Sequence, residues 1–226
     1  MKKNFLALIP LVLALLILLT GCITIGGGRS IRGTGQMVTR EIDVADFSAI
    51  DVSGNFRIVY RHAPVAGLTV VMQENLFNHL ETSVRGGNLQ VRARRNFDTT
   101  GANRPTLYIY APNLTAADFT GAVSASGWDT IRGQSFAIEA TGAASLTLDL
   151  DVERLEMNIS GAASATLTGS AGTINIDGSG AFNLRAGDLQ IQDGRVNVSG
   201  AANVTLSTLD NVNVNASGLA RVRAAD

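Results

Sequence analysis

The side chains best suited to chemistry in this sequence are acids and amides that recur at one position of a repeat. Each stands three residues before a glycine, and the set comprises Asp51, Asp118, Glu139, Asn158, Asp177, Asn197 and Asn215. In a stack of similar strands these residues would form a row on the outer face. Such a row can hydrogen-bond an extended glycan, or it can hold neighbouring strands in register. The pattern therefore predicts a candidate binding surface, with a purely structural ladder as the alternative.

Asp118 and Glu139 are the pair to consider for catalysis, because they would be neighbours in adjacent repeats. They are the candidate acid and base of a polysaccharide lyase or hydrolase. The chain has no lysine after Lys3, and no histidine accompanies the repeat serines as a Ser-His-Asp triad would require. Calcium needs six or more oxygen ligands, which this spacing does not supply. We therefore expect no catalytic residues, no metal and no cofactor.

Two further sets of residues are candidates for binding. Trp128 is the only tryptophan, and it would serve as an exposed platform for a sugar or would cap an end of the core. A run of arginines contains Asp98 as its single acid and comprises Arg85, Arg92, Arg94, Arg95 and Arg104. Charges of this kind protect a strand edge, and binding of an anionic polymer or of lipid headgroups is the alternative.

An internal repeat positions these residues. Ser or Thr followed by Gly and a small or apolar residue recurs with glycine spacings of 21, 19, 19, 20 and 18 residues, at Gly121, Gly142, Gly161, Gly180, Gly200 and Gly218. A related tripeptide surrounds Gly54. Repeats of about 20 residues are typical of solenoids, in which each unit buries its apolar side against its neighbours.

Apolar residues alternate with polar ones on both sides of each glycine. Around Gly161 the apolar phase contains Leu155, Met157, Ile159, Ala163, Ala165 and Leu167. Period-two alternation indicates strands with one buried face. The glycine falls in the inward phase, so we expect it to be a core position at which the strand bends and no side chain fits.

The pattern predicts an all-β fold, a single-domain parallel β-helix with coils of about 20 residues and right-handed like most parallel crossovers. The domain would cover residues 36–226, with irregular first coils over 36–110 and regular repeats over 111–226. A β-sandwich or an antiparallel meander is the alternative. Self-association through the open ends of the coil stack is a further expectation.

The N-terminal segment has the features of a lipoprotein signal peptide over residues 1–22. Lys2 and Lys3 precede an apolar run, and Leu19-Thr20-Gly21-Cys22 resembles a bacterial lipobox ending at Cys22. Cys22 is the only cysteine, so no disulfide can form within the chain. Residues 23–35 are glycine-rich and would form a tether to the membrane. We expect an exported protein, lipid-anchored to the outer membrane or to the outer face of the cytoplasmic membrane.

Charge excludes one class of partner. The segment after Cys22 carries 16 arginines and 19 acids, and the acids are concentrated in residues 111–226. A net-acidic exported protein is not expected to bind nucleic acid.

The order of several segments is also informative. FSAIDVSGNFRIVYRH, LTVVMQEN, GGNLQVRAR and TLYIYAPNLTAADFTGA precede the repeats, and together the chain resembles the bacterial "putative autotransporter adhesin, head GIN domain" family from Val44 to Arg223. The resemblance implies an exported, often lipid-anchored β-helical domain without catalytic residues. We therefore expect a non-enzymatic adhesion or binding module for a glycan or an envelope protein. The alternatives are a polysaccharide-processing enzyme and a structural or stress-related envelope component.

Overall fold

The protein is mostly β-strand. A computed structural model describes residues 30–99 and 103–225. The signal peptide, Cys22 and the first part of the expected tether lie outside the described residues. The elements are β1 (Ile31–Arg32), β2 (Met37–Ile42), β3 (Ala49–His62), β4 (Gly67–Gln73), the 3-10 helix η1 (Glu74–His79), β5 (Leu80–Arg85), β6 (Asn88–Ala93), β7 (Phe97–Asp98), β8 (Thr106–Ala111), β9 (Ala116–Ala125), β10 (Ile131–Leu206), β11 (Val212–Ala216) and β12 (Arg221–Ala224).

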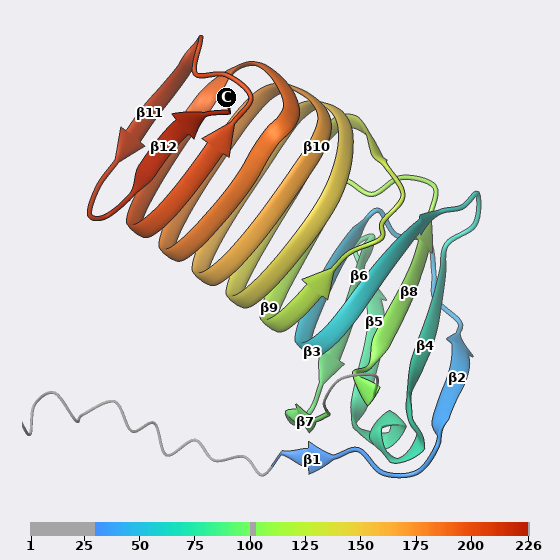
Figure 1. Ribbon diagram of the computed structural model, residues 1–226. Helices are drawn as coiled ribbons and strands as arrows, with labels where there is room; N and C mark the ends of the chain where they lie inside the picture. The colour runs from blue at the N-terminus through green and yellow to red at the C-terminus, as the bar shows by residue number, and fades with distance from the viewer. Residues whose placement is uncertain (1–29, 100–102, 226) are drawn as a thin grey trace, which may run out of the picture.

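Strands β3 and β9 to β12 pair in parallel and are called here the coil stack. β9 lies between β3 and the first part of β10, so that Gly54, Gly121 and Gly142 are in register. β11 and β12 pair with the last part of β10 at an offset of 18 residues. Figure 1 shows the ribbon of β10 winding in successive turns from β9 to β11. The register places the same repeat position of each turn beside that of the next.

The core of the coil stack is built from columns of alternating residues. Val52, Phe119 and Ala140 are buried and in register, so a large ring lies between two smaller side chains. Inward residues on both sides of each turn continue this core through β10. Period-two burial along the strands follows from the pleat, which points successive side chains to opposite faces.

The glycines occupy sharp bends, and here the structure corrects the expectation of core positions. Gly161 is half-buried, and Gly142 and Gly180 are exposed. The constraint is the neighbouring backbone: a Cβ at Gly161 would lie 2.5 Å from the carbonyl oxygen of Gly142. All three glycines also have positive φ, a conformation that other residues adopt at a cost. The bend therefore needs glycine because turns stack closely, not because the interior is narrow.

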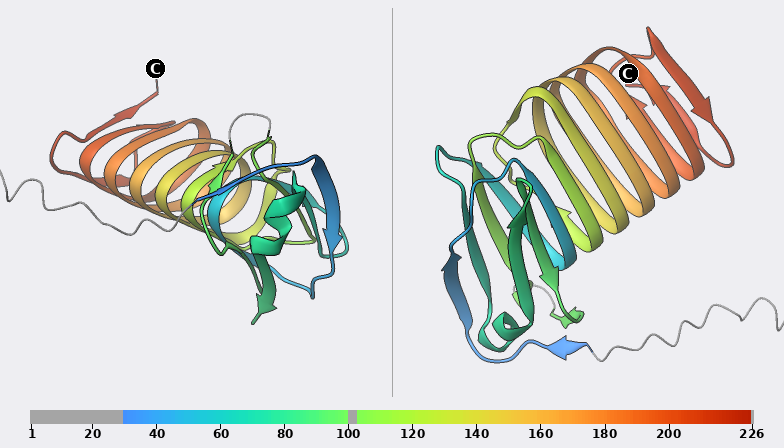
Figure 2. Two further views of the ribbon diagram at one scale, coloured as in Figure 1. Left: turned by 90° about the horizontal axis from the view of Figure 1, so that it is seen from below. Right: turned by 180° about the vertical axis from the view of Figure 1, so that it is seen from behind.

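The segment from residue 36 to 110 differs from the expected irregular coils. β6 and β8 pair in parallel with the two halves of β3, but three further pairings are antiparallel: β2 with β4, β4 with β8, and β5 with β6. Figure 2 shows these strands as an open layer at the N-terminal end of the coil stack. For β5 and β6 the physical reason is local, because Gly86 and Gly87 both have positive φ and form the two-residue turn that favours a hairpin.

The C-terminal part of the expected tether is attached to the fold. β1 pairs in parallel with β7. The Thr34 amide donates to Asn75 Oδ1 at 2.8 Å, and Asn75 Nδ2 donates to the Arg32 carbonyl at 2.9 Å. The prediction of a loose tether over residues 23–35 is therefore wrong for residues 31–34. Within residues 30–99 and 103–225 we find no helix with the length and hydropathy of a membrane span.

Candidate ligand-binding groove

A groove runs across the coil stack along the predicted row. It is open to solvent, has a volume of about 660 Å³ and is lined by three consecutive residues from each of five turns: 139–141, 158–160, 177–179, 197–199 and 215–217. In each triplet the first and third side chains project outward, and the middle residues Ala140, Ile159 and Val198 are buried, as the alternation of a strand requires. The middle residue of the third triplet is Gly178, and Ala216 in the last turn is exposed. The outward pairs form the two walls, and the backbone between them forms the floor.

One wall contains five of the predicted residues: Glu139, Asn158, Asp177, Asn197 and Asn215. Asn215 Nδ2 donates to Asn197 Oδ1 at 2.9 Å, and Asn197 Nδ2 donates to Asp177 Oδ1 at 2.8 Å. The amides thus form a chain that points toward Asp177. Hydrogen bonds join Asp177, Asn197 and Asn215 into a ladder, and all five residues of this wall border the hollow.

The other wall consists of hydroxyl side chains directly before each glycine: Thr141, Ser160, Ser179, Ser199 and Ser217. Each hydroxyl can both donate and accept a hydrogen bond. The sequence shows a Ser or Thr before each repeat glycine, but the prediction did not join these residues and the acid–amide row into one groove. The signal was present, because residues two apart on a strand share a face.

The N-terminal continuation of the row is acidic. Asp118 is in register with Asp51 on one side and with Glu139 on the other. Partial burial, followed by the charges of Asp51 and Glu139, raises the pKa of Asp118, and Arg92 opposes the shift. Arg92 makes an ion pair with Asp51 at 2.7 Å, and this hydrogen bond is the main cause that raises the pKa of Arg92. Asp118 and Glu139 are thus neighbours, as predicted, while Asp118 lies beyond the residues that line the groove.

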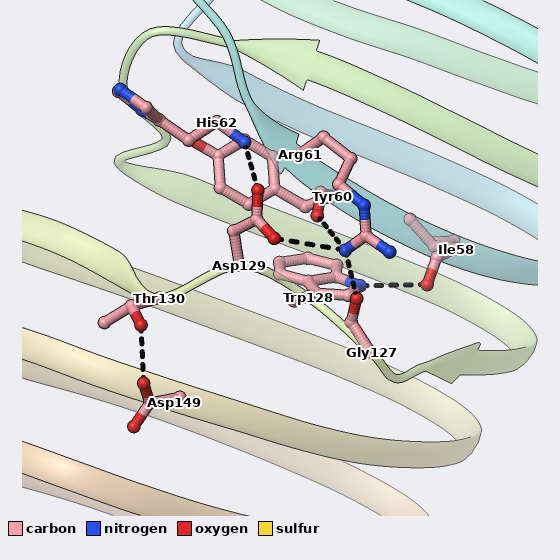
Figure 3. A network of polar contacts seen from close by, with 9 residues as sticks. All are labelled: Ile58, Tyr60, Arg61, His62, Gly127, Trp128, Asp129, Thr130 and Asp149. Carbon is pink, nitrogen blue, oxygen red and sulfur yellow. Dashed lines mark hydrogen bonds and ion pairs between the residues drawn. The ribbon is translucent and has the colours of Figure 1, made fainter.

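Trp128 is not an exposed platform. Its side chain is 8% exposed, and its Nε1 donates to the Ile58 carbonyl at 2.9 Å (Figure 3). The ring packs against Tyr60 and Phe119, with centroids 5.8 and 6.3 Å away. An indole is retained inside a core where its N–H finds an acceptor, and here the acceptor is the carbonyl of the last residue of β3 that pairs with β9. Trp128 therefore caps the core beside β3, and a binding surface that includes it is wrong.

An ion pair beside Trp128 holds the loop that carries it. Arg61 contacts Asp129 at 3.2 Å and donates to the Gly127 carbonyl, and the His62 amide donates to Asp129 at 2.9 Å (Figure 3). Burial, with the charge of Asp129 as a second cause, raises the pKa of Tyr60. Sequence reasoning missed this clamp because its members are more than 60 residues apart.

The arginines of the predicted basic patch differ in their surroundings. Arg92 pairs with Asp51, and Arg94 pairs with Glu81 at 2.6 Å. Arg104 is half-buried and donates to the Ala122 carbonyl, and burial together with nearby Arg57 lowers the pKa of Arg104. Arg85 and Arg95 are exposed. Ion pairs with acids therefore balance the charges of Arg92 and Arg94, two of the five arginines in the predicted patch.

The lining of the groove offers hydrogen-bonding groups and negative charge to a ligand. The described residues contain no group of three or more His, Cys, Asp or Glu arranged to hold a metal ion.

Residues 46–225 match the family model "Putative auto-transporter adhesin, head GIN domain". The chain belongs to this head GIN domain family. The family match confirms the resemblance seen in the sequence. It shows neither a lipid anchor nor a specific ligand.

Solved structures similar to this head GIN domain show the same β-rich fold. A "putative adhesin" from Bacteroides fragilis has 16% identity and a TM-score of 0.74, covering 87% of this chain and 100% of its own. A "putative lipid binding protein" from Parabacteroides distasonis has 16% identity and a TM-score of 0.61, covering 88% and 100%. A "putative adhesin" from Parabacteroides merdae has 14% identity and a TM-score of 0.58, covering 87% and 99%. No curated protein matches the chain.

Proposed function

We propose that this head GIN domain is a non-enzymatic binding module of the bacterial envelope whose groove holds an extended glycan. The observation that carries the proposal is the continuous hollow shared by five turns, with a row of polar side chains along each wall. It is long in the direction of stacking and lined by hydroxyl, amide and carboxylate groups. These groups suit a chain of sugars, each of which offers several hydroxyls for hydrogen bonding.

The architecture that we infer for the coil stack is a right-handed parallel β-helix forming one domain with the N-terminal sheet. Its support is the parallel register of β3, β9 and β10 together with the successive contacts of glycine on glycine from Gly54 to Gly218. A rigid stack of this kind keeps equivalent side chains at a spacing of about 4.8 Å. A repeating polymer is the natural ligand of a repeating surface.

The proposed location is the envelope, with the chain anchored through acylated Cys22. Eight residues separate Cys22 from β1, so the domain would remain within about 30 Å of the bilayer. Radiolabelled palmitate should be incorporated into the wild-type chain, and Cys22→Ser should abolish the labelling. Labelling of the variant to the wild-type level would contradict the anchor.

The test of binding is a glycan array probed with the protein purified in detergent. We expect binding to extended polysaccharides, weakened by Ser179→Trp, which would fill the groove with an indole. Ala201→Trp is the matched control, because residue 201 is exposed outside the groove lining. Matrix proteins on the same array test the alternative of a protein ligand. If no glycan binds, or if both variants bind as the wild type does, the groove is not the binding site.

The second candidate is a polysaccharide-processing enzyme that uses Asp118 and Glu139. The observation in its favour is the register of the two carboxyls together with the raised pKa of Asp118, since an acid and a base need different pKa values. Turnover of a bound polysaccharide that is lost in both Asp118→Asn and Glu139→Gln would favour the enzyme. A structural or stress-related role would gain if neither binding nor turnover is found.

A further inference from the structure

We propose that the groove selects a polysaccharide that carries free amines over neutral and acidic polysaccharides. The inference rests on the proposed function and specifies the ligand. The groove is lined by two charged residues, Glu139 and Asp177, and both are acids. No lysine, arginine or histidine lies among its lining residues, so nothing in the described lining would neutralise a carboxylate-bearing sugar.

The row continues this negative charge beyond the end of the groove. Asp118 follows Glu139 in register, and Asp51 follows Asp118. Arg92 balances the charge of Asp51 through its ion pair, which leaves Asp118, Glu139 and Asp177 to set the sign of the local field. A cationic ligand would be attracted to this face, and an anionic one would be repelled.

The hydrogen bonds of the row also leave an excess of acceptors. Asn215 donates to Asn197 and Asn197 donates to Asp177, so each of these amides spends a donor within the ladder. The second carboxylate oxygen of Asp177 and both oxygens of Glu139 make no hydrogen bond to the described residues. An ammonium group offers three donors and no acceptor, which complements this lining better than a hydroxyl does.

The spacing of the two carboxylates favours a polymer over a single amine. Glu139 and Asp177 occupy the same position two turns apart, which is about 10 Å along the stack. One turn is close to the length of one sugar in an extended β-1,4-linked chain, and every second sugar of such a chain presents its amine on the same side. One ligand can therefore bring two ammonium groups to the two carboxylates.

The experiment compares three oligosaccharides of equal length by isothermal titration at low salt: β-1,4-linked glucosamine, its fully N-acetylated form and galacturonate. We expect the amine form to bind tightest, and galacturonate not to bind. Glu139→Gln combined with Asp177→Asn should weaken binding of the amine form by roughly three- to tenfold, as expected for two exposed ion pairs. Binding of the N-acetylated form should weaken by a smaller factor, because it loses hydrogen bonds to carboxylates but no ion pair. Oligolysine of the same charge tests whether a cationic peptide binds instead.

A matched double variant, Glu153→Gln with Asp188→Asn, removes two exposed acids outside the groove lining and should keep the preference for amines. Equal binding of the amine and N-acetylated forms would overturn the charge selection and leave the proposed groove intact. Tightest binding of galacturonate or of oligolysine, or an equal loss in the matched variant, would also overturn it. Failure of every oligosaccharide to bind would count against the proposed function itself.

Discussion

The replacement Gly161→Ala tests whether close stacking of turns explains the recurring glycine. Gly161 has a φ of +119°, and a Cβ there would lie 2.5 Å from the carbonyl oxygen and 3.0 Å from the nitrogen of Gly142. The backbone conformation costs an alanine about 1–2 kcal/mol. The overlap adds about 1–3 kcal/mol, as for an overpacked core, because the opposing atoms belong to the backbone and cannot rotate away. We expect a loss of about 2–5 kcal/mol in the free energy of unfolding.

Gly86→Ala is the matched control. Gly86 has a φ of +58°, and a Cβ there would meet nothing within 4 Å. Its replacement should cost only the backbone term, about 1–2 kcal/mol. The effect of alanine on the unfolded chain is common to both variants and cancels in their difference. The difference of about 1–3 kcal/mol therefore contains the contact between Gly161 and Gly142, together with any extra cost of a φ of +119° over one of +58°.

Urea denaturation followed by fluorescence measures this difference, because Trp128 is the only tryptophan and is buried beside the coil stack. With a slope near 2 kcal/mol per molar urea, the Gly161→Ala midpoint should lie roughly 1 M below that of Gly86→Ala. Equal midpoints for the two variants would show that backbone conformation alone demands the glycine. The explanation from stacked backbones would then be refuted.

Three further predictions concern the ends of the row and of the coil stack. The raised pKa of Asp118 means that its charged form opposes folding above the folded-state pKa, and that this penalty disappears as the pH falls below the ordinary value of 3.8. Asp118→Asn should therefore raise the free energy of unfolding at pH 7 by a few tenths to about 1 kcal/mol and should give no gain at acidic pH. Thermal melts across a range of pH measure this gain. A gain that grew as the pH fell would contradict the prediction. Trp128→Phe removes the bond to the Ile58 carbonyl and should cost about 1–3 kcal/mol in circular-dichroism melts while leaving glycan affinity unchanged. Self-association through the C-terminal coil should appear in sedimentation velocity as a concentration-dependent dimer. Val214 is half-buried on β11, and Val214→Arg should abolish this dimer. A dimer that persists in the variant would place the interface elsewhere.

The repeat made much of the coil stack predictable, because period and phase are properties of the sequence itself. The apolar phase around Gly161 predicted the buried residues Leu155, Met157 and Ile159. The exposure of the glycine was not predictable from the same alternation. A positive φ turns the residue out of the regular pleat, so its phase in the sequence no longer indicates which way it faces.

The N-terminal half was harder to predict, because its pairings join segments without a common period. β6 begins at Asn88 directly after Gly86-Gly87, and the antiparallel pairing of β5 with β6 depends on these two glycines forming a two-residue hairpin turn. Trp128 illustrates the same limit. A tryptophan after a glycine fits an exposed loop as well as a core cap, and the acceptor at Ile58 that decides between them lies 70 residues away.

The two interpretations of the polar row, ladder and binding surface, apply to different parts of it. From Asn215 to Asp177 the side chains bond to one another, so this part contributes to the register of the turns whether or not a ligand binds. Glu139 has no such bond to the described residues, and it stands in register with another acid, an arrangement that costs stability. A residue that only maintained register would be an amide here, as Asn197 and Asn215 are in later turns. A structural role therefore explains the choice of a carboxylate at Glu139 poorly. Binding of a positively charged ligand explains it better.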